Sequence, residues 1–250
     1  MLDPDTLIIV AATFLLAGAV KGVIGLGLPS VSLGILTAAI DLPTAMALLL
    51  APSFVTNLWQ GVVGGKLREI LVRTWPFLLA ATVTIPIGAL ALSRLNLSWL
   101  AALLGILLAL YSGLSLAGYR ASITPKSETW AGPAFGITNG VLTGMTGSFV
   151  VPGVMYLQAI GLPRDALVQA MGVLFTLSTV MLGIVLGGNN LLTAQLGWVS
   201  LLAVVPAIGG MVAGQKLRKL LSEQLFRKVF FVSLLVLGLY IIISAAQRLM

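Results

Sequence analysis

The two halves of this chain carry the same markers in the same order. In each half, two glycines four residues apart enclose a polar residue, and a Leu-Pro pair and a later proline follow. The markers are Gly18, Lys21, Gly22, Leu42, Pro43 and Pro86 in the first half, and Gly136, Asn139, Gly140, Leu162, Pro163 and Pro206 in the second. Tyr111 and Tyr240 occupy corresponding places near the ends of the halves. The sequence therefore predicts an internal duplication.

Lipid must be the solvent for most of the chain. Hydrophobic residues make up 59% of the sequence, charged residues only 8%, and the mean hydropathy is +1.10. A soluble domain carries about 25% charged residues. The net charge of +7 comes from cations in short loops between apolar spans. This placement indicates membrane topology and attraction to anionic lipid, so the lipid bilayer is an expected partner and nucleic acid is not.

Two residue types that carry much of enzyme chemistry are missing, since the sequence has neither cysteine nor histidine. Disulfides, Cys or His metal sites and Ser-His or Cys-His catalysis are therefore excluded. We expect no metal, no cofactor and no enzymatic activity. We also expect no cleavable signal peptide, because residues 1–6 lack a basic region and contain Asp3 and Asp5.

Six apolar runs approach the roughly 20 residues that a bilayer core demands. They are residues 43–63, 75–92 and 97–119 in the first half, and 163–186, 196–212 and 229–246 in the second. The first run of each set begins at a matched Leu-Pro pair. Proline is well tolerated in the first turn of a helix, so these pairs predict helix starts.

The beginning of each half is interrupted by glycines. In the first half, the apolar residues 7–23 lead into Gly22, Gly25 and Gly27, which Pro29 follows. In the second half, residues 133–142 lead into Gly140, Gly144 and Gly147, which Pro152 follows. A short apolar stretch comes after each cluster, at 30–40 and at 148–160. A straight helix of that length reaches ~16–20 Å, which is less than a core of ~30 Å. We therefore predict a pair of helices broken at the glycines, within the membrane, at the start of each half.

Basic residues predict the orientation. The loop at 64–74 contains Lys66, Arg68 and Arg73, whereas its counterpart at 187–194 has no charge. In the next loop the pattern reverses, with Arg94 alone in the first half and, in the second, Lys216, Arg218, Lys219, Arg227 and Lys228. Arg120 and Lys126 place the central linker in the cytoplasm. These charges predict that both termini are outside and that the halves are inverted.

The predicted fold is an all-α polytopic membrane protein built from two inverted-topology repeats. Each repeat is a glycine-broken pair of short helices followed by three long transmembrane helices. The repeats comprise residues 1–119 and 131–250, and a cytoplasmic linker at 120–130 joins them.

Several segments resemble the TauE/SafE-type family of sulfite exporters and related permeases for small sulfur-containing anions. They are GAVKGVIGLG at 18–27, TNLWQ at 56–60, GVLTGMTGS at 140–148, Pro152 with Tyr156, and QAMG at 169–172. The likeness covers nearly the whole chain and implies a multi-pass transporter of small oxyanions or organosulfonates in the bacterial inner membrane. Another branch of that family has Gly-Thr-Asn where this chain has Leu49, Leu50 and Ala51, so a substrate cannot be copied across branches.

The glycine clusters are candidate anion sites. Helix ends inside a membrane leave backbone N–H groups without intrahelical partners, at the positive end of the helix dipole. We expect oxyanion oxygens near residues 30–31 and 148–150. The candidate residues are Gly22, Gly25, Gly27, Ser30, Gly140, Thr143, Gly144, Thr146, Gly147 and Ser148. The alternative is that the glycines let helices pack closely, and both roles can hold together.

Lys21 is the only charged residue within an apolar span. It lies 14 residues after Leu7, or ~21 Å along a helix, and burying its ammonium costs at least a few kcal/mol. An anionic substrate would offset that cost. The alternative is that the ammonium binds carbonyls at the end of its own helix. Asn139 occupies the corresponding position, or slot, of the second half, and we expect the two slots to face one cavity.

Three amides are further candidates. Asn57 and Gln60 share a face of one helix, and Gln169 lies on the corresponding helix of the other half. They can donate to sulfonate oxygens, or they can act only as links between helices. Trp59, Tyr156 and Trp198 are expected to be packing residues or interface anchors.

All seven acidic residues are expected in loops, at a terminus or at helix ends, so no buried proton relay is predicted. Asp41 and Asp165, which border the short helices, are the exceptions that remain open.

The leading hypothesis is a secondary transporter of a small anion, with sulfite and organosulfonates as first candidates, working by alternating access at the repeat interface. A permease for a carboxylate or another anion is the alternative on the same scaffold. An intramembrane enzyme lacks the necessary residues. A non-transporting membrane subunit would be favoured by continuous helices through residues 22–30 and 140–148.

Overall fold

The computed structural model describes residues 3–119, 121–218 and 222–249, and these residues form twelve α-helices and no strand. Arg120 and Lys219, two of the cations used to predict topology, lie outside the described residues. The helices of the first half are α1 (Pro4–Ile24), α2 (Leu28–Ala39), α3 (Leu42–Leu48), α4 (Leu50–Val62), α5 (Leu67–Val83), α6 (Ile85–Arg94) and α7 (Leu97–Leu116). Those of the second half are α8 (Pro125–Thr146), α9 (Gly153–Ala159), α10 (Arg164–Gly188), α11 (Ala194–Leu217) and α12 (Glu223–Gln247).

The chain is a multi-pass membrane protein. In the described part, six helical segments are long and apolar enough to cross a membrane, and a seventh is formed if the bent pair α3–α4 counts as one span. The helix order is the same in both halves: a long helix, a short helix and three further spans, of which α3–α4 and α5–α6 are interrupted. This order agrees with the sequence. The inversion of the halves across the membrane stays a prediction.

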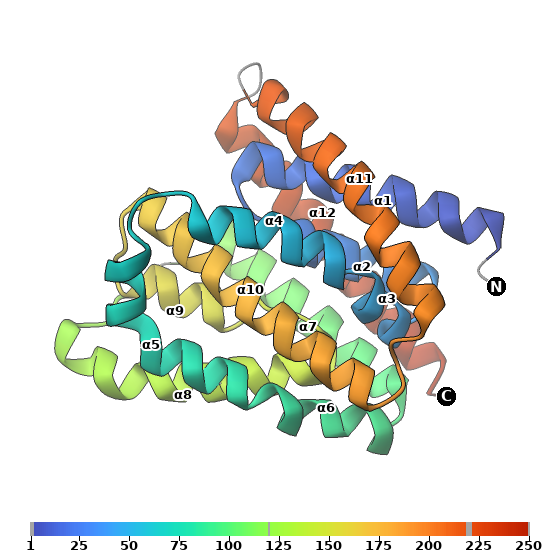
Figure 1. Ribbon diagram of the computed structural model, residues 1–250, viewed down its shortest axis with the longest axis horizontal. Helices are drawn as coiled ribbons and strands as arrows, with labels where there is room; N and C mark the ends of the chain where they lie inside the picture. Colours follow the sequence, from blue (N-terminus) through green and yellow to red (C-terminus); the bar gives the residue numbers. More distant parts are fainter. Residues whose placement is uncertain (1–2, 120, 219–221, 250) are drawn as a thin grey trace.

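The two halves interleave. Helix α1 packs along α11 of the second half, and α8, the counterpart of α1, packs along α5 and α6 of the first half. The counterparts α4 and α10 pack on each other, as do α7 and α12. Figure 1 shows α4 and α10 in the middle, with α1 and α11 on one side and α5, α6 and α8 on the other. Neither half is therefore a separate unit.

The ends of the molecule differ in charge. Both termini lie at the right of Figure 1, whereas α5 and α8 begin at the left. The segments at these two helix starts contain Lys66, Arg68 and Lys126. The basic segments thus lie at the end of the molecule opposite to the termini.

Glycines bring the backbones of α1 and α11 into contact. A Cβ atom added at Gly18 or Gly22 would overlap the carbonyl oxygens of Ala207 and Met211. In return, a Cβ atom at Gly210 would overlap the carbonyl oxygen of Leu15. Any larger residue at these positions would push the helices apart, so the predicted packing role of this glycine pair is confirmed.

The contact between α8 and the α5–α6 pair is built in the same way. Cβ atoms at Gly140 and Gly144 would overlap the carbonyl oxygens of Ala81 and Ile85. Helix α8 continues through Gly140 and Gly144 without interruption, just as α1 continues through Gly22. The prediction that the helices break at these three glycines is wrong, because close packing on a neighbouring helix is compatible with helical backbone there.

The breaks occur at the later glycines. Gly25 ends α1 with φ of +81°, and Gly27 precedes α2 with φ of +106°. Gly147 ends α8 with φ of +72°. These are left-handed conformations that glycine adopts without the steric penalty of a Cβ atom. The second short helix begins at Gly153 rather than near Ser148, so a non-helical segment, residues 148–152, separates it from α8.

The predicted span at 43–63 is two helices bent by 46°. Pro52 has no N–H to donate to the carbonyl oxygen of Leu48. The Ser200 hydroxyl of α11 donates to that oxygen instead (2.8 Å) and accepts from Ala51 N (3.0 Å). A side chain inserted into the hydrogen-bond ladder beside a proline accounts for the bend.

Two predicted loops are shorter than expected. Helix α5 begins at Leu67 within the loop predicted at 64–74, and α8 begins at Pro125 within the linker predicted at 120–130. Both differences have one cause. Each helix begins with a polar turn that extends past the apolar core, and a hydropathy pattern does not detect such a turn as helix. Pro125 stands in the first turn of α8, where proline is well tolerated.

Candidate functional site

Lys21 lies in the last turn of α1 and its side chain crosses to α4. Only 5% of Lys21 is exposed. Its Nζ donates to Thr56 Oγ1 (3.2 Å) and to Asn57 Oδ1. Thr56 Oγ1 donates to Pro52 O (2.8 Å), so toward Lys21 it acts as an acceptor. The ammonium is thus bound by neutral groups of a second helix, rather than by carbonyls at the end of α1.

No carboxylate of the described residues pairs with this buried ammonium. Asn57 turns its oxygen toward Lys21, because an ammonium can only donate. Its amide nitrogen, Nδ2, is buried and has no partner within the described chain. One N–H of Lys21 and the Asn57 amide therefore remain as donors beside an uncompensated positive charge.

The matched slot of the second half is built differently. Asn139 Oδ1 accepts from Gly153 N (2.9 Å), which fixes the start of α9. Asn139 Nδ2 is buried and unpaired in the part of the chain that is described. Lys21 reaches α4 and Asn139 reaches α9, and the central α4–α10 pair lies between α1 and α8 (Figure 1). That the two slots face one cavity stays a prediction.

Hydroxyl groups hold the second break. Thr143 Oγ1 donates to Ser148 O (2.9 Å). Thr146 Oγ1 donates to Leu142 O (2.7 Å) and accepts from Ser148 N (3.2 Å). Both threonine protons are therefore used within the protein, and these side chains shape the segment at residues 148–152.

The first break is lined by apolar groups. Gly25 faces Val168 of α10, and Gly27 faces Val20 and Phe230. Ser30 is buried, and its hydroxyl makes no hydrogen bond with another described residue. Among the predicted residues of this break, Ser30 is the one with a polar side chain left to bind a ligand.

The two glutamines connect α4 to α10. Gln60 Nε2 donates to Val168 O (2.7 Å). Gln169 Nε2 donates to Gly61 O (2.9 Å), and its Oε1 accepts from Lys66 N (3.1 Å). These side chains fasten the end of α4 and the following loop to α10. This is the linking role that the sequence left as the alternative to binding.

The aromatic side chains agree with their predicted roles. Trp59 and Trp198 are each 67% exposed, as expected for interface anchors. Tyr156 is buried, with ring centroids 4.6 Å from Phe77 and 5.6 Å from Phe135. It therefore packs α9 against α5 and α8.

The acidic residues also lie as expected where they are described. Asp41 accepts from Thr44 N and from Thr44 Oγ1, both at 2.8 Å, and so caps α3. Asp165 lies in the first turn of α10. Helix capping accounts for Asp41 without a role in proton transfer.

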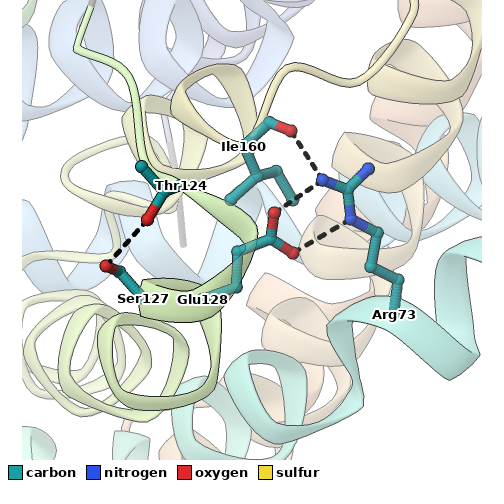
Figure 2. Close-up of polar contacts among 5 residues, drawn as sticks. All are labelled: Arg73, Thr124, Ser127, Glu128 and Ile160. Carbon is teal, nitrogen blue, oxygen red and sulfur yellow. Dashed lines mark hydrogen bonds and ion pairs between the residues drawn. The ribbon is translucent and has the colours of Figure 1, made fainter.

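Figure 2 shows a polar cluster that the sequence did not reveal. Arg73 of α5 donates to Glu128 of α8 through Nε (3.0 Å) and Nη2 (2.7 Å), and Nη2 also donates to the carbonyl oxygen of Ile160 (2.7 Å). Nearby, the hydroxyls of Thr124 and Ser127 share a hydrogen bond (3.0 Å). From the sequence, Arg73 could be assigned only a role in topology, because no local pattern links residues so far apart.

The chain matches the model of a known protein family. The family model described as "Sulfite exporter TauE/SafE" matches residues 10–241. The chain belongs to the TauE/SafE sulfite exporter family. This match confirms the resemblance seen in the sequence and covers both halves. No curated protein and no solved structure matches the chain. TauE/SafE is a family of membrane transporters, and the family suggests a sulfite or related anion exporter.

Proposed function

We propose that this protein is a secondary transporter that moves a small anion, sulfite or an organosulfonate, across the bacterial inner membrane. The observation that carries the proposal is the Lys21 ammonium, which is buried and has no carboxylate partner among the described residues. A cation at the centre of a bilayer costs roughly 2.5–3.5 kcal/mol on insertion scales. A bound anion offsets this cost, and the family match makes a sulfur oxyanion the first candidate.

The groups around Lys21 suit such an anion. The remaining N–H of Lys21 and the amide of Asn57 are donors without partners, and a sulfonate or sulfite group offers several acceptor oxygens. Thr56 and Asn57 hold the ammonium without neutralising it. In this proposal the anion supplies the missing negative charge.

Alternating access is the second part of the proposal. Helix α1 packs on the second half and its counterpart α8 packs on the first half, which agrees with two halves related by a pseudo-two-fold axis. The loop charges predict that the halves are inverted, with both termini outside. The glycine breaks also favour transport over a non-transporting subunit, for which continuous helices through residues 22–30 and 140–148 would be expected.

The test is anion flux into proteoliposomes that contain the purified protein. Sulfite, methanesulfonate and lactate are compared in competition, and wild-type protein is compared with Lys21→Met. The neutral side chain leaves no charge for an anion to offset, so flux should fall at least tenfold while membrane insertion is retained. Lys126→Met, at an exposed lysine of α8, is the matched control. Undiminished flux by Lys21→Met would overturn the proposal, and faster flux of lactate would favour the carboxylate permease.

A further inference from the structure

The segment between α8 and α9 contains buried backbone groups without partners. Phe149, Val150 and Val151 are 0%, 5% and 5% exposed. Their backbone N–H groups make no hydrogen bond with any described residue. More than 90% of buried backbone N–H groups in proteins are paired. Three consecutive unpaired donors in one buried segment therefore indicate a ligand site.

Two side chains add donors at the same junction. Asn139 Nδ2 and Ser178 Oγ are both buried and both unpaired within the described chain. Gly153 donates its N–H to Asn139 and lies against Leu174 of α10, and the ring centroids of Phe149 and Phe175 of α10 are 5.8 Å apart. Ser178 follows Leu174 by one helical turn on the same face. The unpaired groups thus come from α8, α10 and the segment between α8 and α9.

The hydrogen-bonding capacity left at this junction consists mostly of donors. Asn139 must turn its oxygen toward the Gly153 N–H, so only its NH₂ group is free. The three backbone groups can only donate, and the Ser178 hydroxyl is the one group that can also accept. Successive backbone N–H groups are a recurrent way of binding anions without a positively charged residue. A group with several acceptor oxygens and no proton satisfies this set best.

We infer that the junction of α8, α9 and α10 is a second anion subsite, in which the backbone of Phe149, Val150 and Val151, Asn139 Nδ2 and Ser178 Oγ bind the oxygens of the transported anion. The identity of the ligand rests on the proposed function. The groups of this subsite come from α8, α10 and the segment between α8 and α9, whereas those around Lys21 come from α1 and α4. The protein therefore binds two anions, one at a charged site and one at a neutral site.

Equilibrium dialysis of methanesulfonate against the detergent-purified protein tests the number of sites, since this anion stays ionised at all relevant pH values. Wild-type protein should bind two equivalents, and Lys21→Met should retain one. Asn139→Asp keeps the oxygen that binds Gly153 and replaces the NH₂ donors by a carboxylate. At pH 8 this variant should lose the second equivalent, and at low pH the protonated carboxyl should donate again and restore it. A merely structural role of Asn139 would not produce this reversible pH dependence.

Ser178→Ala provides a test that does not depend on a new charge. Loss of one hydrogen bond to an anion should weaken the second site about tenfold. Thr138→Ala is the control, because that exposed hydroxyl donates to Ala134 O of its own helix. A single equivalent in wild-type protein, or two undisturbed equivalents in both Asn139→Asp and Ser178→Ala, would overturn the inference. Lys21-dependent flux with only one bound anion would refute the subsite and leave the proposed function standing. Two bound anions without flux would support the subsite and refute the proposed function.

Discussion

The guanidinium of Arg73 lies 2.7 Å from a carboxylate oxygen of Glu128 and equally close to the carbonyl oxygen of Ile160, the residue that follows α9. One side chain thus joins α5, α8 and α9 (Figure 2). Since Asn139 binds the first residue of α9, the short helix is held at both ends. The residue 120 positions after Arg73 is Thr193, which caps α11 instead. The two halves therefore differ at this point.

We expect the Arg73–Glu128 pair to contribute a measurable coupling free energy. Arg73→Met and Glu128→Gln should each lower the free energy of unfolding, and the double variant should lose about 1 kcal/mol less than the sum of the two losses. The pair is bidentate and only partly exposed, so its coupling free energy should lie near the upper end of the range for surface ion pairs. Thermal unfolding in detergent measures this coupling, which high salt should reduce. Additive effects would contradict the prediction. Thr124→Ala, at the nearby exposed hydroxyl pair, should change stability by less than about 0.5 kcal/mol.

Asn57→Asp should separate folding from transport. The variant places a carboxylate where Asn57 Oδ1 accepts from Lys21, so the buried charge gains a counter-ion within the protein. We expect anion flux to fall at least tenfold while the thermal unfolding temperature stays the same or rises. Asn57→Leu, which removes the acceptor, should lower both. Full flux in Asn57→Asp would show that the charge of Lys21 is not what attracts the substrate.

The glycine contacts of α11 allow a comparison between adjacent positions. A Cβ atom at Gly210 would overlap the backbone of α1, whereas one at Gly209 meets no atom within 4 Å. Gly210→Ala should destabilise the fold by about 1–3 kcal/mol through overpacking. Gly209→Ala should be neutral or slightly stabilising, because alanine favours helix more than glycine does. Unfolding curves of the two variants in one detergent provide the measurement, and equal stabilities would be inconsistent with the packing described.

Gln169 should control the order of the loop after α4. Gln169→Leu removes the hydrogen bonds to Gly61 O and Lys66 N, so we expect faster amide hydrogen exchange at residues 61–66 and a loss of stability of about 1 kcal/mol. Asn189→Ala, near the other end of α10, removes a hydrogen bond within its own helix and should leave that loop unchanged. Unaltered exchange at 61–66 in Gln169→Leu would contradict this role.

Local signals predicted the order of helices and part of each break. Gly25, Gly27 and Gly147 could be recognised as candidates because left-handed backbone favours glycine. Gly22, Gly140 and Gly144 look the same in the sequence, and only the neighbouring helices show that they are packing residues. The sequence also identified Lys21 and Asn57, although not that they contact each other.

Contacts between distant residues could not be predicted. The bend between α3 and α4 depends on Ser200, which is separated from Ala51 by most of the chain. The partners that Lys21 and Asn139 contact follow from tertiary packing, and periodicity within one helix contains no such information. A repeat shows that two positions correspond, but not that they meet.

The interlocking of α1 with α11 also has a consequence for biogenesis. Helix α1 ends at Ile24, but α11 begins only at Ala194. A growing chain therefore inserts its first helix long before the partner that fits its glycine face has been translated. Until α4 has emerged, Lys21 likewise lacks Thr56 and Asn57. Until then, α1 must pack against lipid or against a component of the insertion machinery. We therefore expect chains truncated before α11 to be degraded rather than assembled.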